Sequence, residues 1–192
     1  MDEREARATA EALQQLREAF PEEWREDPLG WEGVLAWEAE QHVTLPEPYR
    51  TFIAEVSNGS ALGPPEDGGL LPLGWMPHRW PDRNGLRDPA AAFPLEYSWY
   101  WDQGADEPRG ENTARYERVH RHGSIPLGTE AAGMEWILVT AGMHRGSIWA
   151  LTEVGACPYD GVAEQPWTTQ YTGIGFLDWV RQWRDGEGRF AE

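Results

Sequence analysis

Cysteine and long apolar runs are scarce in this 192-residue chain. The single cysteine, Cys157, cannot form an internal disulfide, and no spacing of cysteines and histidines resembles a zinc site. Apolar runs such as 136–139 are much too short to span a bilayer, and residues 1–7 are charged where a signal peptide would be apolar. We therefore expect a cytoplasmic protein without a membrane span, a disulfide or a bound metal.

Lysine is absent: all 16 basic residues are arginines, against 33 acidic residues, and the formal net charge is −17. Such a surface repels nucleic acid and anionic membranes, because both require clustered positive charge. It would attract a basic protein partner and speed the encounter. Solubility alone is the competing explanation of the charge.

Patterns that would support catalysis are also missing. Prolines interrupt the glycine-containing stretch 63–68 and remove the N–H donors that a phosphate loop needs. His120 and His122 would lie on one face of a strand as two metal ligands, but the spacing gives no third ligand, and a solvated surface pair is the simpler interpretation. Cys157 is typical of a loop residue without a nearby base. We predict no catalytic, cofactor-binding or metal-binding residues.

The sequence is rich in tryptophan, with twelve residues, most of which we expect in the core. Together with the carboxylates of 102–111, they raise the alternative of a carbohydrate-active enzyme. A general acid needs a buried carboxyl with a raised pKa, however, and these carboxylates belong to a polar segment. We regard an enzyme as the least favoured function.

One stretch, 45–59, has the clearest local pattern. Two prolines suit the first turn of a helix, and four apolar residues then share one helical face: Tyr49, Phe52, Ile53 and Val56. Asn58-Gly59 ends this helix. A short strand over 70–73 follows.

The remaining segments predict an α+β fold, with a mostly antiparallel sheet of about five or six strands and helices packed against it. Further helices are expected over 2–20, 31–42 and 173–183, the second with Trp31, Val34, Leu35 and Glu38 along one side. Strands are expected over 93–101 at a sheet edge, over 124–128 and over 167–171, and 133–140 and 147–151 are expected to form a hairpin. A loop is expected over 102–114.

The order of Leu45-Pro46, the helix, Asn58-Gly59 and a Leu-Pro-Leu-Gly ending at 74, followed by 125–128 (Ile-Pro-Leu-Gly) and a terminal aromatic helix, resembles the SUKH superfamily (the Smi–Knr family). The resemblance covers about 31–184, after an N-terminal helix and linker (1–30) and before a tail (185–192). Residues 75–122 are an elaboration of the middle. One departure is Met134-Glu135, where the family often has an aspartate.

The resemblance implies a non-enzymatic protein-binding module. Many bacterial members look like immunity proteins, which neutralise a cognate secreted toxin, often a nuclease. An intracellular scaffold or regulatory protein without a toxin partner is the alternative.

We predict that the basic protein partner binds the middle elaboration, where aromatic anchors and acidic residues occur together. The alternative is that these tryptophans fill the core and the acidic segment is only solvated. The predicted residues are Trp75, Trp80, Trp99, Trp101, Asp102, Asp106, Glu107 and Glu111.

Overall fold

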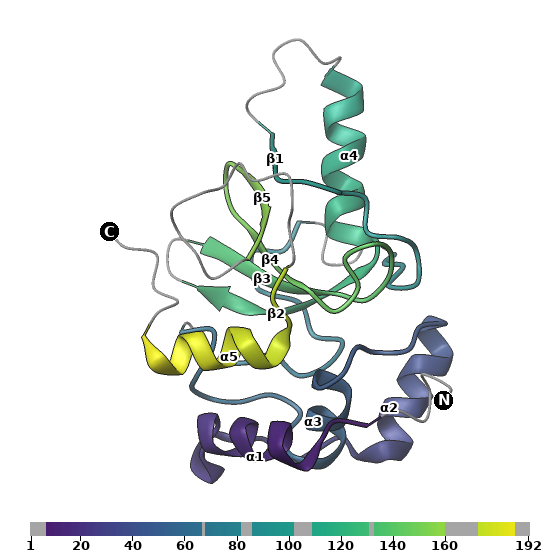
Figure 1. Cartoon of the computed structure of the whole chain (residues 1–192). Coiled ribbons are helices and arrows are strands. Elements are labelled where there is room, and N and C mark those ends of the chain that lie inside the picture. Colours follow the sequence, from purple (N-terminus) through teal and green to yellow (C-terminus); the bar gives the residue numbers. More distant parts are fainter. Residues whose placement is uncertain are drawn as a thin grey trace.

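The computed structural model describes residues 7–66, 68–81, 86–101, 109–130, 133–159 and 173–186, with side chains from 112 onward in the fourth range. It is an α+β fold of five α-helices and a five-stranded sheet, which confirms the predicted class (Figure 1). The elements are α1 (Ala10–Ala19), the 3₁₀ helix η1 (Glu22–Trp24), α2 (Gly30–Gln41), α3 (Tyr49–Glu55), β1 (Trp99–Tyr100), α4 (Arg109–Arg121), β2 (Ser124–Glu130), β3 (Met134–Val139), β4 (Ile148–Leu151), β5 (Gly155–Pro158) and α5 (Phe176–Asp185).

The sheet is antiparallel throughout, in the order β1-β5-β4-β3-β2. The predicted hairpin is confirmed, because β3 pairs with β4, and β2 pairs with the other edge of β3. The β2–β3 register shifts between Pro126 and Gly128. Gly128 is required there, because its φ is +151° and an added Cβ would lie 2.5 Å from Pro65 Cγ.

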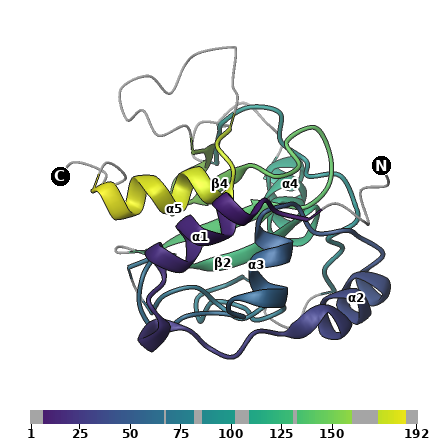
Figure 2. The same cartoon turned by 60° about the horizontal axis from the view of Figure 1, so that its bottom comes forward.

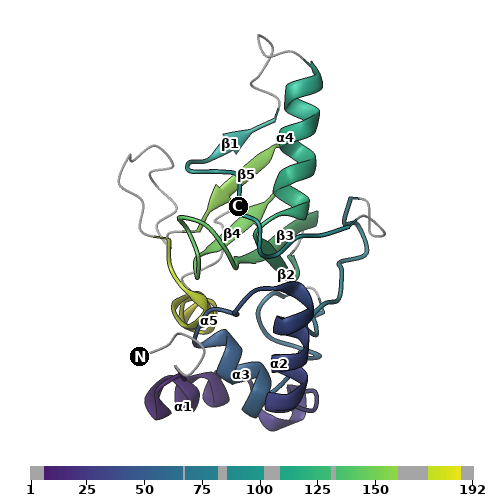
Figure 3. The ribbon, with the colours of Figure 1, turned by 90° about the vertical axis from the view of Figure 1, so that its right-hand side faces the viewer.

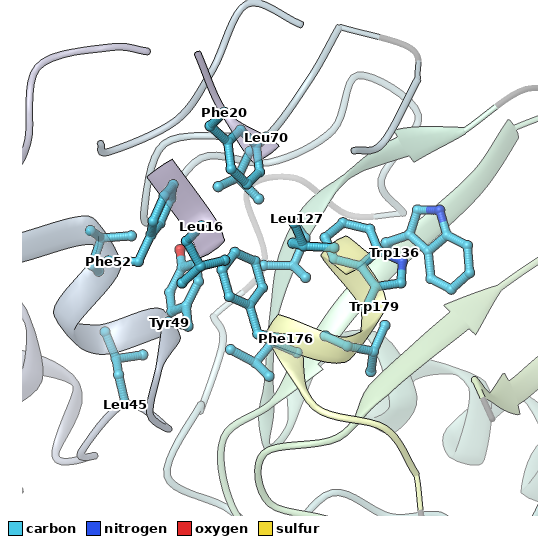
Figure 4. Packing of buried hydrophobic residues seen from close by; sticks show 14 of the residues in the cluster. Leu16, Phe20, Leu45, Tyr49, Phe52, Leu70, Leu127, Trp136, Phe176 and Trp179 are labelled. Atoms are coloured by element: carbon cyan, nitrogen blue, oxygen red, sulfur yellow. The ribbon is translucent and has the colours of Figure 1, made fainter. Parts of the chain in front are cut away.

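The first core lies between the sheet and α1, α3 and α5. All four apolar residues predicted on the α3 face are buried. The Phe52 ring centroid is 5.1 Å from that of Phe20 and 5.6 Å from that of Phe176, and Figure 4 shows these rings beside Tyr49. Helices α1 and α5 lie side by side (Figure 2), where Arg181 Nε donates a hydrogen bond to Gln15 Oε1. Aromatic packing thus joins the two ends of the chain.

A second core covers the opposite face of the sheet. Successive strand residues point to opposite faces, so Trp136 and Leu138 enter the first core, and Ile137 and Val139 the second. Helix α4 lies on this second face, away from the other helices (Figure 3), and contributes Val119. Because both faces are covered, β3 is apolar along almost its whole length.

Two expected strands differ in the structure. Only Trp99–Tyr100 of 93–101 pairs with the sheet, at its edge as predicted, and Tyr97 is 62% exposed. Phe93 and Leu95 are buried from irregular backbone instead. The stretch 70–73 is not a strand: Leu71 N–H donates to the Leu127 carbonyl, but the next N–H on that side, that of Leu73, donates to Asn58 Oδ1 instead.

Other expectations also change. Residues 109–114 belong to α4 rather than to a loop, and α3 begins at Tyr49, after the prolines. His120 is a buried residue of α4, which rules out the strand-face pair with His122. Cys157 lies in β5 rather than in a loop, and Leu35 of α2 is exposed. The first helix begins at Ala10 with Thr9 as its N-cap, so residues 7–9 are not helical, contrary to expectation. The expected strand over 167–171 and residues 2–6 lie outside the described residues.

Replacing Phe52 by alanine should lower the free energy of unfolding by about 3–5 kcal/mol, because its buried ring packs on two other rings. Denaturant unfolding measures the change. Leu35→Ala, at an exposed position of α2, is the control and should cost less than about 1 kcal/mol. A midpoint for Phe52→Ala equal to that of the wild type would show that the α3 face is not part of the core.

Candidate protein-interaction surface

A buried ion pair joins α2 to α3. Glu38 is 7% exposed and Arg50 is 1% exposed. Glu38 Oε1 accepts hydrogen bonds from Arg50 Nε (2.8 Å) and from the Leu45 backbone N–H (2.7 Å), and Oε2 accepts one from Arg50 Nη2 (3.0 Å). The Trp31 ring lies 5.1 Å from the guanidinium carbon of Arg50. The charge of Arg50 is therefore used inside the protein and does not reach the surface.

Two other arginines of this region also have partners within the chain, Arg25 inside the fold and Arg7 at the surface. Arg25 donates hydrogen bonds to the carbonyls of Phe20 (2.6 Å) and Arg17 (2.7 Å), at the end of α1, where orphan carbonyls favour a cation. Arg7 forms an ion pair with Glu55 (3.3 Å) and stacks on Trp31 at 4.3 Å. Positive charge here stabilises helix ends and helix contacts.

Most acidic residues of the same region are exposed to solvent. Residues 7–66 contain twelve acidic residues and four arginines, a formal balance of −8. Eight exposed carboxylates lie on α1, η1, α2 and the segment between η1 and α2. These elements form one end of the molecule, opposite α4 (Figure 3). We call this set the acidic end: Glu11, Glu18, Glu22, Glu23, Glu26, Asp27, Glu32 and Glu40.

The middle elaboration carries little of the net charge. Residues 75–122 contain eight acidic residues and seven arginines, a balance of −1 in a chain of −17. Asp102, Asp106 and Glu107 lie outside the described residues, and Glu111 lies in α4 with its side chain outside them. Seven arginines of 75–122 therefore offset the acidic residues on which the predicted site depended.

Three of the four predicted tryptophans come together on the second face of the sheet. Trp80 is 4% exposed and fills the second core, so it is not available to a partner. Trp99 and Trp101 are half-buried with centroids 5.2 Å apart, and His120 lies 5.2 Å from Trp80 and 6.0 Å from Trp101. This cluster holds α4 on the sheet.

Trp75 is separate from that cluster and is 65% exposed. The backbone N–H of Trp75 donates to the Pro72 carbonyl (3.0 Å) and closes a turn. The third residue of this turn, Gly74, has φ +85°, as a type II turn requires. A Cβ on Gly74 would lie 3.4 Å from Trp37 Nε1. The turn that carries Trp75 therefore lies against Trp37 of α2, the helix that contributes Glu32 and Glu40 to the acidic end. Sequence reasoning missed this contact between the turn and α2, because Trp37 precedes the turn by more than 30 residues.

Glu135, where the chain departs from the SUKH pattern, is the buried carboxyl of greatest chemical interest. It is 6% exposed, Oε2 accepts a hydrogen bond from Thr129 Oγ1 (2.9 Å), and Oε1 has no partner among the described residues. Burial raises the pKa of Glu135, while Thr129 and Arg79 oppose the shift. A general acid needs such a raised pKa, but glycoside hydrolysis uses a pair of carboxylates, and among the described residues no other carboxylate is a cause of the Glu135 shift.

Comparison with known proteins gives no assignment: no family model, no curated protein and no solved structure matches the chain. In the described part of the chain, no group of three or more histidine, cysteine, aspartate or glutamate side chains is placed to hold a metal ion. None of the described helices has the length and apolar character needed to cross a membrane.

Replacing Glu38 by glutamine should destabilise the protein by about 3 kcal/mol, because it leaves the Arg50 guanidinium buried without a counter-charge. Glu40→Gln, an exposed glutamate on the same helix, is the matched control and should change stability by less than about 0.5 kcal/mol. Chemical denaturation compares the two, and equal midpoints would contradict a structural role for the ion pair.

The stability should fall as the pH drops below 6.5, in part because of His120. Burial, with Arg87 nearby, lowers the pKa of His120 below 6.5. Between the lowered and ordinary pKa values the unfolded chain binds a proton that the folded chain does not, so acidification favours unfolding. His120→Phe should reduce the loss of melting temperature between pH 7.5 and 5.5. The exposed control His42→Asn should retain the wild-type loss; equal losses in all three proteins would refute the assignment to His120.

Proposed function

We propose that this chain is a non-enzymatic protein-binding module whose acidic end holds a basic protein partner. The observation that supports this most directly is the distribution of charge in residues 7–66: eight carboxylates of the acidic end are exposed, whereas Arg25 and Arg50 are hydrogen-bonded internally and the exposed Arg7 is paired with Glu55. A uniform solubility charge would not require this division. Concentrated negative potential raises the rate of encounter with a positively charged protein.

The partner that the SUKH resemblance implies is a secreted toxin, which makes the chain a bacterial immunity protein acting in the cytoplasm. A nuclease toxin fits this role, because proteins that grip the phosphate backbone carry basic surfaces. An acidic inhibitor can then compete with the nucleic acid for the same surface. A toxin reading frame beside the gene would separate this role from that of a scaffold or regulatory protein.

Association kinetics with the purified product of that reading frame test the proposal. The variant Glu22→Gln/Glu23→Gln/Glu26→Gln removes three carboxylates of the acidic end. It should slow association about tenfold or more at low salt, with a weaker salt dependence and a smaller change in dissociation rate.

Two variants with the same change in net charge serve as controls. Glu96→Gln/Glu117→Gln/Glu153→Gln neutralises exposed carboxylates away from the acidic end and should leave association near the wild-type rate. Asp102→Asn/Asp106→Asn/Glu107→Gln tests the site predicted from the sequence. If either control slows association as much as the first variant, or if the toxin does not bind, the acidic end is not the binding surface.

A further inference from the structure

Trp75 has the most exposed aromatic side chain in the described part of the chain, at 65%. A tryptophan side chain normally packs against other residues and buries about 150–250 Å² of surface. Tryptophan is also enriched among the residues that contribute most of the binding energy at protein interfaces. We therefore consider the exposed Trp75 side chain as a contact for a partner.

The backbone around Trp75 is fixed before any partner arrives. The Leu73 N–H donates to Asn58 Oδ1 (3.0 Å), and the Leu73 side chain packs against the first core. The turn closed by the Trp75 N–H follows directly, with Trp37 against Gly74. An anchor held in this way loses little conformational entropy on binding.

The residues near the turn favour a cation as the group that Trp75 binds. Trp37 lies beside the turn, and Glu40 follows it by three residues, on the same side of α2. Elsewhere the chain itself uses tryptophan to hold arginine: Arg7 and Arg50 stack on Trp31 of α2, and two further stacks occur on Trp80 and Trp99. Among the described residues, no arginine lies over Trp75.

We infer that Trp75, on a turn that lies against Trp37 of α2 at the acidic end, is the anchor that receives an arginine or lysine side chain of the basic partner. The cation stacks on the indole face, and the carboxylates of the acidic end hold the positive residues around it. This inference rests on the proposed function and adds to it the residue that makes the central contact.

A ten-residue peptide of alternating glycine and arginine is the probe, with the matching glycine–citrulline peptide as an uncharged control. Titration into ¹⁵N-labelled protein follows the indole N–H signals, and the Trp75 signal is identified by its loss in Trp75→Phe. The arginine peptide should shift the Trp75 signal, and the citrulline peptide should not. Trp75→Ala should weaken binding of the arginine peptide about fivefold or more, and Trp75→Phe less, as for an exposed cation–π contact.

Met143→Ala, which removes another exposed apolar side chain, is the matched control and should bind as the wild type does. If the peptide binds and the Glu22→Gln/Glu23→Gln/Glu26→Gln variant weakens it, but Trp75→Ala does not, the anchor is refuted while the proposed function stands. If the peptide fails to bind the wild type, or if the glutamate variant binds it unchanged, the proposed function fails as well.

Discussion

The buried ion pair between Glu38 and Arg50 is the contact on which the helical part of the structure depends. Its three hydrogen bonds tie α2, the backbone at Leu45 and α3 into one unit, with Trp31 over the guanidinium. Desolvating two charges is costly, so the pair persists because its geometry is bidentate and its remaining acceptor is satisfied. Once α3 is held in this way, its aromatic face meets α1, α5 and the sheet.

The ion pair also shapes the surface. An arginine that neutralises a buried glutamate is lost to the exterior, as is Arg25, which satisfies carbonyls at the end of α1. The exposed side of the same helices is left with carboxylates. The same arginines that hold the helices together are therefore missing from the surface, and the acidic end is the consequence.

Local patterns in the sequence were enough for part of this fold. The face of α3, the hairpin region and the closing helix α5 could be predicted because each alternates or repeats within a few residues. Helix α4 could not, since its sequence is polar and its contacts with the second core come from a few scattered residues, Tyr116, Val119 and His120, with Arg115 stacked on Trp99. The burial of Trp80 and the exposure of Trp75 depend on tertiary contacts between distant segments.

The location of the candidate surface could not be predicted from local sequence patterns either. Net charge and tryptophan content suggested a basic partner, but they could not place it, because the internal partners of the arginines are contributed by other elements. Hydrogen exchange of the chain, alone and in complex with a basic partner protein, tests the location most directly. The account predicts slower exchange in α2 and at 72–75, with α4 and β1 unchanged. Protection confined to α4 and β1 would contradict it.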